Sequence, residues 1–201
     1  MKDKLYTILF AAVFGTLCGA LLTWVDSVTR SKLDSERIRS VLAVLEIPVE
    51  KGATDEDLSY LFKRTVEVVE KEGLRYFRHV EDGRLQGAAV HFEGFGMWGE
   101  IKGYLALEAD MRTIRSVSFY ELKETAGKGA RIAEPEFRDQ FKGKRIMDAA
   151  GVPGIRIKKG KGHTEQNAVD AITGATVTCG KVEAILNDAI KRFLKEVSGG
   201  Q

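Results

Sequence analysis

Two hydroxyl side chains and a carboxylate are closely spaced near the C-terminal end of the chain, in Asp170-Ala171-Ile172-Thr173-Gly174-Ala175-Thr176. An amphipathic stretch from Val177 to Val197 follows directly and predicts a helix. Asp and Thr are common at helix starts, so capping alone explains them. The same place also favours a phosphate, because free N–H groups and the positive end of the helix dipole lie there. The sequence thus predicts a helix cap, a phosphate site, or both together.

A second segment that could contact a ligand is Glu124-Thr125-Ala126-Gly127-Lys128-Gly129. It follows a predicted strand. Its two glycines allow the backbone to approach a ligand closely, and Thr125 offers a hydroxyl. A plain turn is the alternative interpretation of the same residues.

Both segments resemble the FMN-binding domain family. Residues 170–176 fit its flavinylation pattern, Asp-x-x-(Ser/Thr)-Gly-Ala-(Ser/Thr). Residues 124–129 resemble the Glu-Thr-Pro-Gly-Leu-Gly loop found in the NqrC family of sodium-translocating NADH:quinone reductases and in the RnfG family of Rnf complexes. Segments that agree in order and spacing are Gly94-Phe95-Gly96-Met97-Trp98, Phe119-Tyr120-Glu121, residues 137–144 and Lys159-Gly160. The resemblance runs from about Gly94 to Lys191.

The resemblance implies that Thr176 carries FMN through a phosphoester bond to the flavin phosphate, and that a separate flavin transferase reads the motif. The other cofactor-binding residues that it implies are Asp170, Thr173, Gly174 and Ala175 of the motif, Thr125, Gly127 and Gly129 of the loop, Trp98, and Lys159. A core position is the alternative for Trp98, whereas Lys159 would pair with the flavin phosphate.

Two positions depart from the family loop. Ala126 replaces Pro, which predicts a looser loop. Lys128 replaces Leu, and a cation there would favour a reduced, anionic flavin electrostatically. A solvated side chain is the alternative for Lys128.

Composition and the remaining polar residues exclude several functions. The formal net charge is +2 and the charges are interspersed, unlike the basic face of a nucleic-acid-binding protein. The three histidines, His79, His91 and His163, lack the carboxylate or cysteine spacings of catalytic or metal sites. The sequence therefore predicts neither a catalytic histidine nor a metal site. The sequence has no P-loop pattern for a nucleotide.

The segment from Leu5 to Val25 contains no charged residue, and its 21 residues suit one transmembrane helix. Tyr6 and Trp24 lie near its ends, where interfacial aromatic residues are common. A cleaved signal peptide is the alternative, although its apolar core would be shorter. Counting Lys and Arg does not decide the orientation. A short tail before a large domain, together with the resemblance, predicts a single-pass protein of a bacterial or archaeal cell membrane with its C-terminal domain on the extracytoplasmic side.

The predicted fold is α+β, an antiparallel sheet with flanking helices after the membrane anchor and a helical stalk. The predicted parts are the anchor (1–29), a helical part (30–73) and an FMN-binding domain (74–201). Helices are predicted over 31–47, from Thr54 to Gly73 and over 135–142. Strands are predicted over 74–80, 85–92, 101–109, 113–122 and 155–157, and the alternation in 101–107 predicts a half-buried strand.

These observations favour a membrane-anchored electron-transfer subunit with covalent FMN, little catalysis of its own, and other subunits of an ion-translocating Rnf-type or NADH:quinone-reductase-type complex as partners. Two alternatives remain open. One is a membrane-anchored assembly or binding module without flavin, and the other is a stand-alone flavin reductase. The sequence does not distinguish the two complexes or name the translocated ion.

Overall fold

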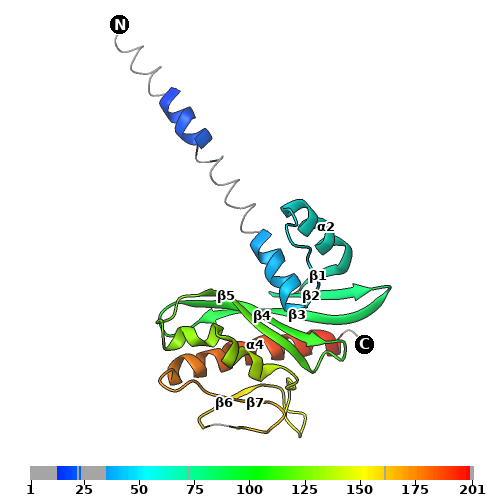
Figure 1. Cartoon of the computed structure of the whole chain (residues 1–201), viewed down its shortest axis with the longest axis vertical. Coiled ribbons are helices and arrows are strands. Elements are labelled where there is room, and N and C mark those ends of the chain that lie inside the picture. The colour runs from blue at the N-terminus through cyan, green and yellow to red at the C-terminus, as the bar shows by residue number, and fades with distance from the viewer. Residues whose placement is uncertain (1–12, 22, 24–34, 72, 161, 200–201) are drawn as a thin grey trace, which may run out of the picture. The chain divides into compact units, whose positions relative to one another are not determined.

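The computed structural model describes residues 13–21, 23, 35–71, 73–160 and 162–199, and the chain divides into two compact units, Met1–Ile38 and Arg39–Gln201. In the first unit, residues 13–21 and 23 are helical (Figure 1). The membrane span predicted over residues 5–25 lies for the most part outside the described residues. Within the described ranges, no helix has both the length and the apolar character needed to cross a membrane.

Five antiparallel strands form the main sheet of the second unit, in the same order in space as in the sequence (Figure 1). They are β1 (Val66–Lys71), β2 (Leu74–Glu81), β3 (Arg84–Phe95), β4 (Glu100–Glu108) and β5 (Ile114–Leu122). The other elements are α2 (Asp55–Thr65), η1 (Gly129–Ala133), α3 (Pro135–Arg138), η2 (Asp139–Phe141), β6 (Arg156–Lys158), β7 (Ala168–Asp170) and α4 (Thr176–Gly199). The predicted antiparallel sheet with flanking helices is therefore confirmed.

Helices cover both faces of the sheet, as two neighbouring residues of β2 show. Tyr76 packs edge-on against Phe193 of α4, with ring centroids 5.3 Å apart. Phe77 points to the opposite face and packs against Phe62 of α2, with centroids 5.9 Å apart. β4 is consequently buried along most of its length. The half-buried strand predicted for residues 101–107 is therefore wrong.

A left-handed residue ends the helix that precedes α2. Residues 39–44 are helical, and Glu46 then adopts φ 57°. Its N–H donates to the carbonyl of Ala43 at 3.1 Å, while the N–H of Ile47 donates to the carbonyl of Leu42 at 2.9 Å. These two bonds form a Schellman motif, which satisfies the last helix carbonyls and turns the chain.

A capping box starts α2 at the predicted residue. Thr54 Oγ1 accepts from the N–H of Asp57 at 3.2 Å, and Asp57 Oδ2 accepts from the N–H of Thr54 at 2.9 Å. The predicted end at Gly73 is wrong, because α2 ends at Thr65 and the chain continues as β1. The valines of β1 suit a strand, and pairing with β2 along the whole of β1 overrides their helical spacing.

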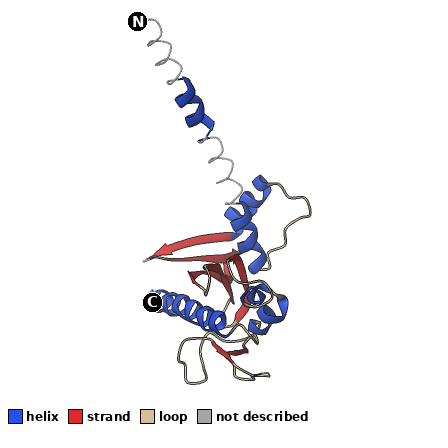
Figure 2. Ribbon diagram, turned by 90° about the vertical axis from the view of Figure 1, so that its left-hand side faces the viewer, coloured by secondary structure: helices blue, strands red, loops and turns tan. Residues whose placement is uncertain are grey.

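The long helix α4 lies between the main sheet and the short parallel pair β6–β7 (Figure 2). Its apolar face packs on the sheet through buried Val182, Leu186, Ala189, Ile190 and Phe193. Its other side binds the chain next to β6. Asn187 Oδ1 accepts from the N–H of Ile155 at 2.6 Å, and its Nδ2 donates to the carbonyl of Ile155 at 3.0 Å. The middle of α4 is thus held from both sides.

Candidate functional site

Thr176 is the first residue of α4, and its side chain is exposed. The preceding Ala175 is buried in the core with only 5% of its surface exposed, while Gly174 turns the chain with φ +83°. The carbonyl of Ala175 accepts the first helical bond, from the N–H of Cys179 at 2.9 Å. The N–H groups of the first helical turn consequently have no partner within the helix. The structure therefore presents a hydroxyl beside a helix N-terminus, as an anion site requires.

A buried thiol holds the motif against the helix. Cys179 is 2% exposed, and its Sγ accepts from the N–H of Ile172 at 3.4 Å. Burial raises the pKa of the Cys179 thiol, although the hydrogen bond from Ile172 opposes this shift. The thiol is thus a neutral packing group. Sequence reasoning missed its role because the cysteine has no partner spacing.

Glu124 joins two loops to α4. Its Oε1 accepts from the N–H of Met97 at 2.6 Å and from the N–H of Trp98 at 3.1 Å. Its Oε2 accepts from the hydroxyl of Thr178 at 2.8 Å. Thr178 is buried and lies two residues after Thr176. One carboxylate therefore connects the β3–β4 loop, the end of β5 and the first turn of α4.

The loop over residues 124–129 packs directly on this turn of α4. A Cβ atom on Gly129 would lie 2.7 Å from Thr178 Oγ1 and 2.6 Å from Glu124 Oε2, so a larger residue would have to displace this hydrogen-bonded pair. The carbonyl of Thr125 accepts from the N–H of Lys128 at 3.2 Å and from that of Ala130 at 3.1 Å. These bonds close the loop although it lacks the proline of the family pattern.

Several predicted contact residues of this loop are open to solvent. Thr125, Gly127 and Lys128 are exposed, and Gly127 has φ +70°. The loop therefore offers a hydroxyl, bare backbone and a cation at the surface beside α4.

Three large apolar side chains are exposed in and beside the β3–β4 loop. They are Phe95, Met97 and Trp98, with 72%, 51% and 68% of their surfaces exposed. Because Trp98 is so exposed, the core position considered for it is wrong. Glu124 holds the backbone N–H groups of Met97 and Trp98 and leaves their side chains in solvent. Val177, next to Thr176, is also 53% exposed. The start of α4 thus has both a polar and an apolar surface close to it.

Asp170 uses its carboxylate to hold another loop. Oδ2 accepts from the N–H of Gly162 at 2.8 Å, and Oδ1 accepts from the N–H of His163 at 3.1 Å. These backbone bonds lower the pKa of the Asp170 carboxyl, and His163 and Lys144 lower it further. Asp170 is consequently an ionised anchor for the segment that follows β6.

Lys159 lies in that anchored segment and is exposed. Its backbone carbonyl lies 3.0 Å from His163 Nε2, and its ammonium group makes no ion pair with the described carboxylates. Gly160 and Thr173 line one cavity of about 300 Å³, together with Arg131, Gln140 and Asp170. The structure thus brings the segment after β6 to the beginning of the motif, on the side of Thr173.

The predicted site residues therefore form two groups. Thr176 lies with the loop over residues 124–129 and with the loop containing Trp98, and Glu124 and Thr178 connect them. Asp170, Thr173 and the Lys159 segment surround the cavity at the other end of the motif. Sequence reasoning did not select Glu124 or Thr178. Glu124 could have been selected, because the family loop also begins with Glu.

The domain can be compared with known proteins on this basis. Residues 96–191 match the family model of the FMN-binding domain. This match spans both loops, the motif and most of α4, so the resemblance to the FMN-binding domain family is confirmed.

Individual NqrC proteins are similar to this chain in sequence and in fold. The chain is 33% identical over 131 residues to NqrC of the Na(+)-translocating NADH-quinone reductase of Yersinia pestis, a match that covers 62% of this chain and 49% of that protein. The chain spans about half the length, or less, of the curated relatives that it matches. Two crystal structures share the fold at 24% identity. NqrC from Shewanella oneidensis has a TM-score of 0.65, over 76% of this chain and 89% of that one. The corresponding protein from Parabacteroides distasonis has a TM-score of 0.71, over 85% and 95%.

The residues of the site fit an FMN phosphate and ring in chemical terms. The exposed hydroxyl and the helix N-terminus suit a phosphate. The exposed aromatic side chains suit a flat apolar ring. Residues 125–128 of the neighbouring loop are exposed and offer polar backbone groups to such a ligand.

Proposed function

We propose that this chain is a membrane-anchored electron-transfer subunit that carries FMN through a phosphoester bond to Thr176. The observation that carries the proposal is the exposed hydroxyl of Thr176 at the first position of α4, within the flavinylation pattern and within the matched domain. When bound, FMN supplies the redox chemistry, because its ring accepts one or two electrons.

The first turn of α4 stabilises the phosphate. Its unpaired N–H groups and the helix dipole favour the negative charge that the phosphoester retains. Lys128 and Lys159 are exposed and supply cations on the two sides of the motif. Lys159 is the proposed partner of the phosphate, and Lys128 favours the negative charge of a reduced ring.

The loops define the position of the ring. Trp98, with Phe95 and Met97, offers an apolar surface. Exposed Thr125 and Gly127 border the ring on the other side, whereas Gly129, also predicted to bind the cofactor, is buried and packs the loop against Thr178. Glu124 holds these loops together through the backbone of the Trp98 loop and the hydroxyl of Thr178. Since these contacts involve only part of a flavin, one edge stays open to a redox partner.

A flavin transferase that uses FAD loads the site. The Thr176 oxygen forms the new bond to phosphorus while the pyrophosphate bond breaks, AMP leaves, and the hydroxyl proton is released to the solvent or to a base. Thr173, Gly174, Ala175 and Asp170 are the residues that this transferase reads. Gly174 and Thr173 are exposed and therefore accessible to it.

The wider assignment rests on the relatives. They are NqrC proteins of Na(+)-translocating NADH-quinone reductases, and this chain is similar to about half of their length. We therefore propose the other subunits of a complex of this type, or of the Rnf type, as partners. Residues 5–25 are the proposed single-pass anchor in a bacterial or archaeal cell membrane, with residues 74–201 as the FMN-binding domain on the extracytoplasmic side.

The decisive experiment is flavin fluorescence of the denatured chain in a gel, after expression with the transferase. Wild type and Thr176→Ser should give a fluorescent band, because the motif accepts either hydroxyl. Thr176→Ala should give none. A fluorescent band from Thr176→Ala would place the attachment elsewhere, and a dark wild-type band would overturn covalent attachment. Co-purification of other subunits in mild detergent is expected for a member of a complex, whereas isolation of an active flavin reductase alone would contradict it.

A further inference from the structure

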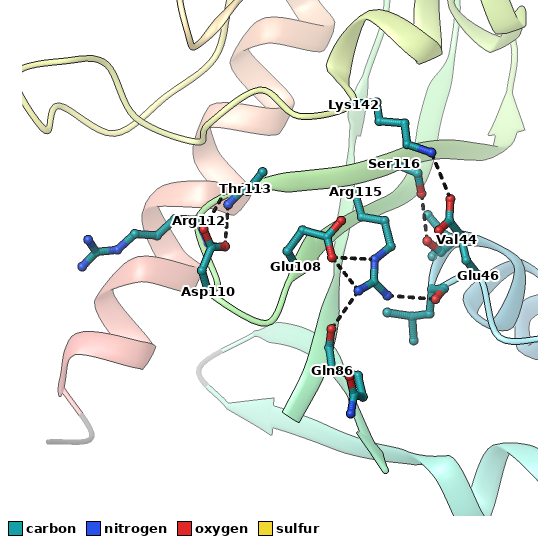
Figure 3. A network of polar contacts seen from close by, with 11 residues as sticks. Val44, Glu46, Gln86, Glu108, Asp110, Arg112, Thr113, Arg115, Ser116 and Lys142 are labelled. Atoms are coloured by element: carbon teal, nitrogen blue, oxygen red, sulfur yellow. Dashed lines mark hydrogen bonds and ion pairs between the residues drawn. The ribbon is translucent and has the colours of Figure 1, made fainter. Parts of the chain in front are cut away.

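The two edge strands of the main sheet, β1 and β5, differ in how they are covered. On the free side of β5, the N–H of Ile114 donates to the carbonyl of Lys144 at 2.7 Å, and the N–H of Gly143 donates to the carbonyl of Ile114 at 2.8 Å. Further along β5, Ser116 Oγ donates to the carbonyl of Val44 at 2.8 Å (Figure 3). The first half of the β5 edge is therefore closed to a further strand.

A two-residue turn between Lys71 and Leu74 determines which backbone groups of β1 face outward. The residues beside such a turn exchange hydrogen bonds with each other, and this pattern alternates along an antiparallel pair. The even-numbered residues of β1 therefore direct their N–H and C=O groups away from β2. Val66 agrees with this phase, because its N–H donates to the carbonyl of Phe62 in α2 and not to β2.

Val68 and Glu70 leave the edge of β1 open. Their outward peptide groups have no backbone partner among the described residues. Both side chains are exposed, that of Val68 over 51% of its surface. β1 contains no proline, and it pairs with β2 in continuous register. This edge can therefore accept another strand through main-chain hydrogen bonds.

Charged side chains on an edge usually prevent such pairing, but the charges of β1 complement each other. Glu67 and Lys71 lie two residues before and two residues after Val69, on one face of the sheet. A two-fold axis at Val69 would place Glu67 of each chain directly opposite Lys71 of the other in an antiparallel pair. In the same register, Val68 would pair with Glu70 through their outward peptide groups.

Ion pairs within the chain extend this arrangement. Glu67 pairs with Arg78 at 3.0 Å, and Lys71 pairs with Glu196 at 2.7 Å. The contact would join these pairs into a row in the order Arg78, Glu67, Lys71, Glu196, with Glu67 and Lys71 from different chains. Charges of opposite sign are neighbours along the whole row, so they attract each other. A register centred one residue earlier would instead place Glu67 opposite Val69 and form no such row.

We propose that a second copy of this chain docks on β1, so that the two five-stranded sheets form one continuous antiparallel sheet across a two-fold axis at Val69. An isologous contact of this kind uses the same surface twice, which suits the self-complementary charges. The proposed membrane anchor favours the contact, because it confines the copies to one layer and raises their effective concentration.

Cysteine cross-linking of the purified full-length chain in mild detergent tests the register, in a Cys18→Ser background. Val69→Cys would lie opposite its own copy with Cα atoms about 4.5 Å apart, which a disulfide can span, and should give a covalent dimer on mild oxidation. Val68→Cys is the control. It would lie diagonally about 7–8 Å from its copy and should cross-link about tenfold more slowly. Exposure alone predicts the reverse order, because Val68 is exposed and Val69 is half-buried.

Sedimentation velocity of the same preparation, without the introduced cysteines, tests the charge pairs. Wild type should form a dimer whose population rises with concentration. Glu67→Lys and Lys71→Glu each oppose like charges twice and should weaken the dimer about fivefold, whereas the double variant should recover most of the loss. Lys181→Glu is the matched control with no expected effect. It makes the same charge change at an exposed residue of α4, about 22 Å along the helix from Glu196.

Three results would overturn the proposal. One is a chain that stays monomeric at every concentration. Another is cross-linking through Val68→Cys that is as fast as through Val69→Cys. The third is a dimer that the charge variants leave unchanged, which would be held through another surface such as the anchor. Thermal unfolding checks that each variant is folded, and if a charge variant does not fold, the two cysteine variants still decide the question.

Discussion

The hydroxyl of Thr178 donates a 2.8 Å hydrogen bond to Oε2 of Glu124, 54 positions earlier in the chain. The other oxygen of the same carboxylate accepts from the backbone N–H groups of Met97 and Trp98. Three segments distant in sequence therefore share the Glu124 side chain. Its partner Thr178 lies two residues after Thr176. A change in this carboxylate should affect stability and the geometry of the loops at once.

Glu124→Ala should lower the free energy of unfolding by about 1–3 kcal/mol, because it leaves a buried hydroxyl and two N–H groups without an acceptor. Thr178→Val should cost about 1 kcal/mol, and a double-mutant cycle by urea unfolding should give a coupling energy of at least about 0.5 kcal/mol. Glu136→Ala, whose side chain is 82% exposed, is the control and should change stability by less than about 0.5 kcal/mol. A coupling energy of zero would contradict a shared carboxylate.

Replacing either of two glycines near Thr176 by alanine should lower the free energy of unfolding, but for different reasons. In Gly129→Ala the new Cβ would meet Glu124 and Thr178 at 2.6 and 2.7 Å and separate their hydrogen-bonded pair. In Gly174→Ala no atom lies within 4 Å, so only the left-handed backbone at φ +83° is strained, by about 1–2 kcal/mol.

Urea unfolding should therefore show a larger loss of stability for Gly129→Ala than for Gly174→Ala. The loss for Gly129→Ala should shrink in the Glu124→Ala background, where one of the two clashes is removed. Gly180→Ala is the control. It should stabilise α4 by about 1 kcal/mol, because this helical glycine has open space around it. Equal losses for the two glycine variants would contradict the steric role of Gly129.

The Asp170 carboxylate should make stability depend on pH. Backbone N–H groups of Gly162 and His163 lower its pKa in the folded state. A lowered folded pKa means that the contribution is fully present above the unfolded value, about 3.9, and is lost as pH falls through the folded pKa. The stability difference between wild type and Asp170→Asn should therefore be large at pH 7 and shrink towards zero below about pH 3.

Urea unfolding across this pH range measures the difference, and amide hydrogen exchange at Gly162 and His163 locates it. Exchange at these two amides should be faster in Asp170→Asn at pH 7. Glu134→Gln, an exposed carboxylate on the surface, is the control. A difference that stays constant with pH would rule out the ionised anchor.

The Cys179 thiol should react slowly in the folded protein. Burial raises its pKa, so less thiolate forms, and the side chain is 2% exposed. In a Cys18→Ser background, a thiol reagent at pH 8 should react over hours in buffer and within minutes in urea. The stability from this neutral thiol is present below its unfolded pKa of about 8.5 and is lost as pH rises through the higher folded value. Rapid reaction in buffer would contradict the buried hydrogen bond to Ile172.

Local sequence predicted the elements well where local chemistry decides them. The capping box at Thr54 appears where its residue types require it. β1 was missed because its valines fit a helix stripe as well as a strand, and only pairing with β2 decides between the two. The burial of β4 was underestimated because alternation along one strand does not reveal how many layers cover the sheet.

The sequence alone determined the motif, the order of its residues and the resemblance to an FMN-binding domain, since these depend on residue types at short spacing. Tertiary structure decided which segments meet at Thr176. Glu124 reaches the Trp98 loop and Thr178 only because the sheet and α4 bring together positions 26 to 54 residues apart. It also directed Asp170 away from Thr176, towards Gly162 and His163. Such contacts depend on packing across the core, which local residue patterns do not encode.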